Sequence, residues 1–214
     1  RRGARRGRGG RSLRSPAGRR LPGARRVGVG TTNRTRAAGC GEAITPRTAA
    51  LLRVHPSNFR VTGFTASAAL AELGKVAHRH GLLLLDDLGS GSLFGIAREP
   101  SVVDSLKHAD VVAFSGDKLL GGPQSGILLG SAELIRKLAK HPLARALRVD
   151  KLSLAALEAT LREWLLGHAP SLVPVERMLT LPAAELRRRA AWWVVKLGDR
   201  EIAAELLEGE SAAG

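Results

Sequence analysis

The sequence is poor in cysteine and has no long apolar run. Its single cysteine, Cys40, rules out an internal disulfide and a metal cluster built from cysteines, and it suits the reducing cytoplasm. No apolar stretch approaches the roughly 20 residues that a membrane span requires. The basic start is not followed by an apolar core, as it would be in a signal peptide. We therefore expect a cytoplasmic protein without a membrane span or a metal site.

Acids are absent from the first part of the chain, and this places most of the net charge of +15 there. Residues 1–36 contain 13 arginines and no acid, so the rest of the 214-residue chain carries only +2. An Arg/Gly-rich segment cannot bury a core, and we expect residues 1–26 to be disordered or degraded. Such a segment could bind RNA phosphates electrostatically, but we favour the alternative that it has no selected role.

What the sequence does contain is a succession of short apolar runs between turn residues. Runs of this kind, apolar on both faces, are typical of buried parallel strands, and amphipathic stretches between them are typical of connecting helices. The predicted strands are residues 49–54, 82–85, 111–114 and 126–130, and the predicted helices are residues 67–80, 99–108 and 132–140, the last capped by Ser131. The first two strands and their helix form a βαβ unit, which is right-handed by rule.

The C-terminal part predicts further helices. Arg145 and Arg148 are three residues apart and would share one helical face. Ser153 is expected to cap a long helix that ends at Gly167. Further predictions are a linker marked by Pro170 and Pro174, a helix at 183–197 and a strand near 203–208. We divide the chain into residues 1–26, a large domain at 27–168, and a linker with the start of a small domain at 169–214.

Polar residues follow two of the predicted strands. Asp86 and Asp87 come after the first of these, and Ser115 and Lys118 come after the next. Ligands of open α/β sheets bind beyond the carboxyl ends of the strands, so a carboxylate and an amine would meet there. The pair suits pyridoxal phosphate, because a lysine amine forms its Schiff base and a carboxylate keeps its pyridine nitrogen protonated. On spacing alone, a salt bridge at the end of the sheet is an equal alternative.

Three longer motifs are more specific than this spacing. DLGSGS, SGDKLLGGPQSG and HPLARALRVDKLSLAALEATL resemble bacterial selenocysteine synthase, the L-seryl-tRNA(Sec) selenium transferase family. The resemblance is strong from about Val27 to Leu165 and weaker beyond. It implies an α/β fold, namely a partial aspartate aminotransferase-like large domain of the pyridoxal-phosphate-dependent transferases of fold type I, followed by the start of a smaller α+β C-terminal domain. Family members are far longer at both ends, so the chain resembles a fragment of one.

The resemblance implies roles for the residues that follow the strands. Lys118 would hold pyridoxal phosphate covalently and, once released, would remove the Cα proton of the substrate. Asp87 would keep the ring nitrogen protonated, with Asp86 as the alternative if the strand register differs by one. Ser115 would help to bind the cofactor phosphate, unless it only caps a turn.

The resemblance also implies roles for four residues in other segments. His55 and Asn58 follow the strand at 49–54 and would face the cofactor, although a local turn explains this loop equally well. Arg145 and Arg148 would bind anions, either selenophosphate or tRNA phosphate, because the arginine fork matches phosphate oxygens. A solvated basic face is the alternative for this pair.

The implied reaction converts L-seryl-tRNA(Sec) to L-selenocysteinyl-tRNA(Sec). Water leaves from Cβ of the esterified serine, and selenium from selenophosphate is added there. The implied assembly is a homo-oligomer of at least two subunits, because fold type I active sites usually lie at a dimer interface. Two alternatives are another fold type I lyase, acting on a small amino acid, and a catalytically inactive RNA-binding fragment.

Overall fold

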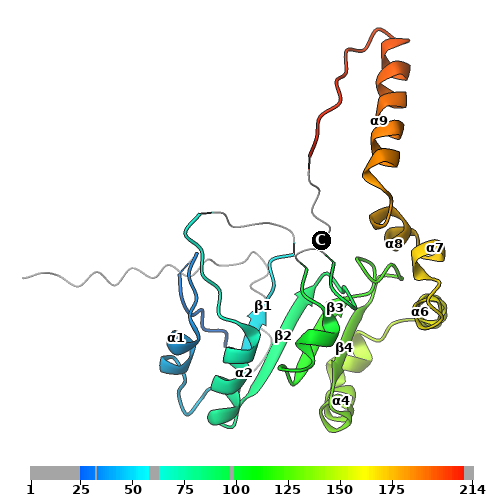
Figure 1. The fold of residues 1–214 in the computed structure, drawn as a ribbon. Helices are drawn as coiled ribbons and strands as arrows, with labels where there is room; N and C mark the ends of the chain where they lie inside the picture. The colour runs from blue at the N-terminus through cyan, green and yellow to red at the C-terminus, as the bar shows by residue number, and fades with distance from the viewer. Residues whose placement is uncertain (1–24, 32, 58–62, 97–98, 210–214) are drawn as a thin grey trace, which may run out of the picture.

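The computed structural model describes residues 25–31, 33–57, 63–96 and 99–209, and its centre is a four-stranded sheet in the order β1-β2-β3-β4 (Figure 1). The strands are β1 (Ala50–Val54), β2 (Leu83–Gly89), β3 (Val111–Ser115) and β4 (Gly126–Gly130). All four predicted strands are therefore confirmed. The predicted Arg/Gly-rich segment lies, except for its last two residues, outside the described residues.

The first three strands are parallel, and β4 is antiparallel to β3. Parallel neighbours need a crossover connection. Helix α2 (Leu70–Arg79) lies between β1 and β2, and helix α3 (Val102–Ser105) lies between β2 and β3. Helix α3 is much shorter than the helix predicted at 99–108: it begins after Ser101, whose hydroxyl accepts a hydrogen bond from Asp104 N, and residues 106–108 form a turn.

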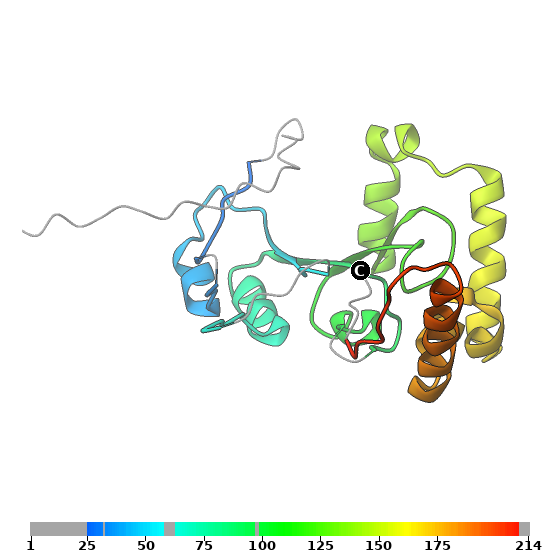
Figure 2. The same ribbon diagram turned by 90° about the horizontal axis from the view of Figure 1, so that it is seen from above.

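The sheet has one buried face and one open face over β1 and β2. Leu84, Leu88 and Val112 point to the buried face, where they form the core with residues of α2. Leu52, Val54 and Leu83 point to the other face and are 37–56% exposed. Figure 2 shows the reason, since α2 and α3 lie on the same side of the sheet. The expectation that the strands are buried on both faces is therefore wrong for β1 and β2 within the described residues.

Helices form most of the C-terminal part. They are α4 (Ala132–Ala139), α5 (Pro142–Ala146), α6 (Lys151–Leu165), α7 (Ala169–Leu172), α8 (Pro174–Leu179) and α9 (Ala183–Gly198), while α1 (Ala37–Glu42) precedes the sheet. The helices predicted at 132–140 and 183–197 are confirmed, and so is the Ser131 cap. None of the described helices has the length and the apolar character needed to span a membrane.

The cap of α6 differs from the prediction. Asp150 Oδ1 accepts hydrogen bonds from Leu152 N at 2.8 Å and from Ser153 N at 3.0 Å, and the Ser153 hydroxyl donates to Asp150 Oδ2 at 2.7 Å. Asp150 is therefore the N-cap, and Ser153 lies inside the first turn. A carboxylate reaches two backbone N–H groups of the first turn at once, so the helix begins before the predicted serine.

Two further C-terminal predictions are wrong. The segment expected to be a linker is helical, because Pro170 and Pro174 each lie in the first turn of a helix, where proline is tolerated. Ala169 and Val173 are buried there, at 2% and 3% exposure. The strand expected near 203–208 is absent, and those residues have no regular secondary structure.

The two faces of the sheet predict unequal effects of the same substitution. Leu84 is fully buried, so Leu84→Ala should lower the free energy of unfolding by about 2–5 kcal/mol. Leu52 is 52% exposed on the opposite face, so Leu52→Ala should change it by only about 0.5 kcal/mol. Urea unfolding of both variants measures the difference, and equal losses would contradict the assignment of the two faces.

Candidate active site

The turn that carries Lys118 lies between β3 and β4 and is closed by its own main chain. We call residues 116–125 the lysine turn. Gly116 N donates to Ser125 O at 2.9 Å, and Gly122 N donates to Gly116 O at 2.8 Å. Leu119 and Leu120, which follow the lysine directly, are both buried. The Lys118 main chain is thereby anchored at the carboxyl end of β3.

A second loop braces the lysine turn from the neighbouring strand. This Gly/Ser loop, residues 89–92, follows β2, and its Ser90 carbonyl accepts a hydrogen bond from Leu119 N at 2.9 Å. Gly91 has φ +75°, and a Cβ there would lie 2.6 Å from Ser115 O, so only glycine fits. The Ser90 hydroxyl is buried and has no hydrogen-bond partner among the described residues. The loop therefore presents a polar group close to the lysine turn.

The two neighbouring aspartates of β2 project from opposite faces of the sheet. Asp87 pairs in register with Val54 and Ala113, so it shares the open side with them and with Ser115, two residues further along β3. Asp86 is 1% exposed on the buried face, where its Oδ1 lies 3.0 Å from Arg53 Nε. The two atoms are near enough for an ion pair, but their alignment does not make a hydrogen bond. Of these two aspartates, Asp87 is consequently the one that remains partly accessible.

Burial raises the pKa of Asp86 above its usual value of 3.8, and Arg53 and Ser105 offset only part of this effect. A carboxylate is costly to desolvate even beside a cation, so the folded protein favours the protonated form more than the unfolded chain does. Asp86 thus lies on the core side of β2, and neither of its carboxylate oxygens has a hydrogen-bond partner among the described residues.

The loop after β1 reaches the same edge of the sheet. His55 N donates to Asp87 O at 2.7 Å, which ties the loop to β2. The His55 ring is engaged by Glu99, with Nε2 and Oε2 3.2 Å apart. Sequence reasoning missed Glu99, because 44 residues separate it from His55 and no local pattern connects them. Asn58, the other residue expected here, lies outside the described residues.

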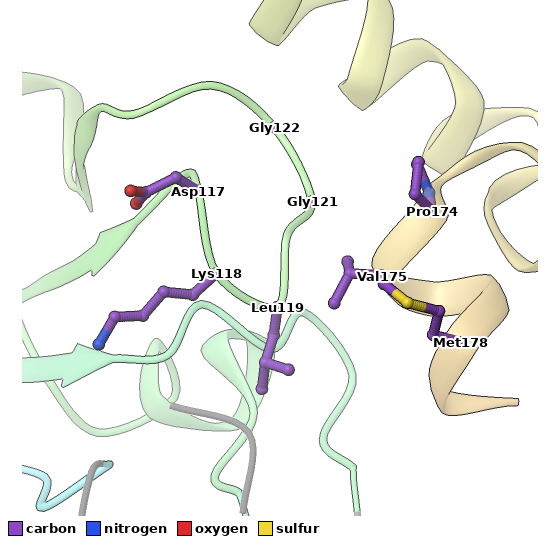
Figure 3. Close-up of a pocket in the computed structure, with 8 residues that line it drawn as sticks. All are labelled: Asp117, Lys118, Leu119, Gly121, Gly122, Pro174, Val175 and Met178. Carbon is purple, nitrogen blue, oxygen red and sulfur yellow. The ribbon is translucent and has the colours of Figure 1, made fainter. Parts of the chain in front are cut away.

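A cavity of about 410 Å³ lies beside the lysine turn (Figure 3). It is lined by Asp117, Lys118, Leu119, Gly121 and Gly122 on one side and by Pro174, Val175 and Met178 of α8 on the other. The Lys118 amine and the Asp117 carboxylate both point away from α8. Sequence reasoning missed Asp117 and the α8 wall. The acid directly before the lysine in SGDK was the available signal for Asp117.

Arg145 and Arg148 do not share a helical face. Helix α5 is only five residues long and has its C-cap at Leu147, so Arg148 lies beyond its end. Both arginines are exposed, and neither lines the cavity beside Lys118. The helix stops there because the chain must turn before Asp150 begins α6.

The sheet and its lysine turn define the class of protein. Three parallel strands, an antiparallel fourth and a lysine between the last two form the large-domain fold of the pyridoxal-phosphate-dependent transferases of fold type I. The solved structure of D-glucosaminate-6-phosphate ammonia-lyase matches with a TM-score of 0.60 and 25% sequence identity, covering 79% of this chain and 41% of that chain.

Sequence comparison then gives the family. Residues 6–211 match the family model described as SelA: L-seryl-tRNA selenium transferase, and the chain belongs to this family. The L-seryl-tRNA(Sec) selenium transferase of Hyphomonas neptunium is 52% identical over 169 residues, which are 76% of this chain and 36% of that protein. The protein of the same name from Carboxydothermus hydrogenoformans is 45% identical over 194 residues, or 87% of this chain and 42% of that protein. The chain thus spans less than half the length of these relatives, and the resemblance seen in its motifs is confirmed.

The two aspartates of β2 should respond differently to removal of their charge. Asp86 has a raised pKa in the folded state, so the free energy of unfolding should fall as pH rises from 3.8 through that folded pKa. Asp86→Asn should remove this fall and leave the variant at least as stable as the wild type at neutral pH.

Urea unfolding at a series of pH values measures the effect, and Asp87→Asn is the control. Because the Asp87 charge is only the smallest of the causes that act on the Asp86 pKa, its removal should reduce the fall slightly without abolishing it. An unchanged slope in Asp86→Asn, or a lost slope in Asp87→Asn, would overturn the assignment of the two faces.

Proposed function

We propose that this chain forms the cofactor-binding core of an enzyme that converts L-seryl-tRNA(Sec) to L-selenocysteinyl-tRNA(Sec) with selenophosphate. Family membership supports the reaction, since the relatives carry the name of this activity. The single structural observation that carries the proposal is the placement of Lys118. It lies in an anchored turn at the carboxyl end of β3, and Asp87 lies on the open side of the neighbouring strand.

The residues present fit pyridoxal phosphate. A lysine amine, an accessible carboxylate on the adjacent strand and the Ser115 hydroxyl are the groups that this cofactor requires. The buried Ser90 hydroxyl, which has no partner among the described residues, adds a polar group in the loop beside the lysine. When bound, the cofactor supplies an electron sink for the charge that develops at Cα of the substrate.

Each residue of the chain then has a defined task. Lys118 would hold the cofactor through its amine, and the same amine, when free, would serve as the general base for the Cα proton. Asp87 holds a proton at the pyridine nitrogen, and Ser115 binds the cofactor phosphate. His55 would face the cofactor from the loop after β1, with the Glu99 carboxylate 3.2 Å from its Nε2, and Asn58, which we assign the same role, lies outside the described residues. The net change replaces the Cβ hydroxyl of the esterified serine with the selenol group, and the phosphate of selenophosphate is released.

The anionic substrates require cationic groups, and we assign Arg145 and Arg148 to them. Both arginines are exposed and neither lines the cavity beside Lys118 of their own chain. They therefore suit the site of a neighbouring subunit in a homo-oligomer, where they would bind selenophosphate or tRNA phosphate. A cytoplasmic location fits this reaction, and the division into domains at 27–168 and 169–214 remains part of the proposal.

Lys118→Ala should abolish covalent attachment of pyridoxal phosphate and lower turnover at least about 10²-fold, the usual contribution of a positioned general base. Borohydride reduction followed by peptide mapping measures the attachment site in the wild-type chain. Asp87→Asn is the matched comparison, since it should retain the attached cofactor but lose most of its turnover. A label on Lys75, Lys107 or Lys151 would contradict the assignment.

Replacing Arg145 and Arg148 together with Gln should weaken the use of selenophosphate or charged tRNA but leave covalent cofactor binding intact. The difference from the wild type should shrink as salt rises, because phosphate contacts are partly Coulombic. Steady-state kinetics of the protein at full family length, at several salt concentrations, measures this.

The control for this pair replaces two other exposed arginines, Arg79 and Arg136, with Gln. Mixing the Arg145/Arg148 variant with Lys118→Ala chains should restore part of the activity. In a mixed oligomer, one site combines the intact Lys118 of the first chain with the intact arginines of the second. If mixed oligomers form and no activity returns, the two arginines do not serve a neighbouring subunit.

A further inference from the structure

Trp164 of α6 contacts the lysine turn and Phe94, just beyond the Gly/Ser loop. Its indole Nε1 donates a hydrogen bond to the Leu120 carbonyl at 2.9 Å, across 44 residues of sequence. Its ring lies 6.1 Å from the ring of Phe94, centroid to centroid, with a tilt of 51°. Leu120 lies two residues after Lys118, and Phe94 lies two residues after the Gly/Ser loop. One side chain therefore connects the C-terminal helices to both segments.

The hydrogen bond meets a requirement of the buried main chain. Leu120 is fully buried, and a buried carbonyl without a donor is destabilising. The indole N–H supplies this donor from outside the sheet. Without this N–H, the Leu120 carbonyl would have to accept a hydrogen bond from water or change its position. Either change would make the lysine turn less rigid.

Helices α6–α8 also pack closely against Gly121 and Gly122, which follow Leu120 in the lysine turn. A Cβ at Gly122 would lie 3.4 Å from Leu157 Cδ1 and 3.5 Å from Thr160 Oγ1, both on α6. Gly121 has φ +75°, and a Cβ there would overlap Cγ1 of Val173. The lysine turn is thus enclosed between the Gly/Ser loop on one side and α6–α8 on the other.

We propose that Trp164 is a positioning residue. Its hydrogen bond to the Leu120 carbonyl holds the main chain of the lysine turn in place at the carboxyl end of β3. Helices α6–α8 then support the lysine turn of the proposed active site, in addition to connecting the sheet to the C-terminal segment. This rests on the proposed function only for the role of Lys118, because the hydrogen bond and the packing hold whatever the lysine binds.

Trp164→Phe tests the proposal, since it keeps an aromatic ring and removes only the donor. Hydrogen–deuterium exchange of the chain without cofactor should be about two- to tenfold faster in the peptide at 116–122, the factor expected for one lost hydrogen bond. Exchange at 83–88, in the neighbouring strand, should stay unchanged. Trp192→Phe, on exposed α9, is the matched control and should resemble the wild type at both sites.

A second measurement follows the cofactor. Titration with pyridoxal phosphate, monitored by the visible band of the lysine-bound form, should give about two- to tenfold weaker binding in Trp164→Phe. The pH midpoint of that band should also move in Trp164→Phe, and in Trp192→Phe it should not. A residue that only fills the core would leave this midpoint in place.

Exchange in Trp164→Phe that equals the wild type, or that rises throughout the sheet, would overturn the proposal. Trp164→Leu separates packing from the donor: equal acceleration at 116–122 in the Leu and Phe variants supports the hydrogen bond, and acceleration in the Leu variant alone overturns it. If the wild-type chain binds no cofactor at Lys118, the proposed function fails, and the exchange data still decide the role of Trp164.

Discussion

The site depends on main-chain hydrogen bonds that hold the lysine turn from two sides. The Ser90 carbonyl accepts from Leu119 N on the sheet side, and the Trp164 indole donates to the Leu120 carbonyl on the helix side, both at 2.9 Å. The two anchored leucines are buried directly after Lys118, so these hydrogen bonds pair main-chain groups that would otherwise be buried without a partner. Glycines at 91 and 121 are needed because any side chain would push the packed segments apart.

The two faces of β2 differ in burial, and this difference gives the two aspartates near the lysine turn unequal environments. Successive side chains of a strand point to opposite faces, so two adjacent aspartates have opposite environments. Asp86 is buried beside Arg53 and has a raised pKa, whereas Asp87 is left on the open side, level with Val54. One acid therefore lies on the core side and the other on the open side, although the two are adjacent residues of the same strand.

Helices α6–α8 form part of the proposed site, because they pack against the lysine turn. Val173 packs on Gly121, and α8 forms the far wall of the cavity beside the lysine turn. The family match covers this region too, since it extends to residue 211. Pro170 and Pro174 lie in the first turns of α7 and α8, and proline at the start of a helix looks the same in a sequence as proline in a linker.

The sequence by itself determined the four strands, helices α2, α4 and α9, the place of Lys118 after β3, and the family. These features depend on local patterns such as apolar runs, caps and a long motif, which need no knowledge of distant residues. Only the tertiary structure decided which aspartate is buried, because an apolar run on both faces conceals which face is covered. It also decided the partners Glu99 for His55 and Trp164 for Leu120, each 44 residues away along the chain. No local pattern encodes such contacts, since they arise only when the packed helices and the sheet edge bring the two segments together.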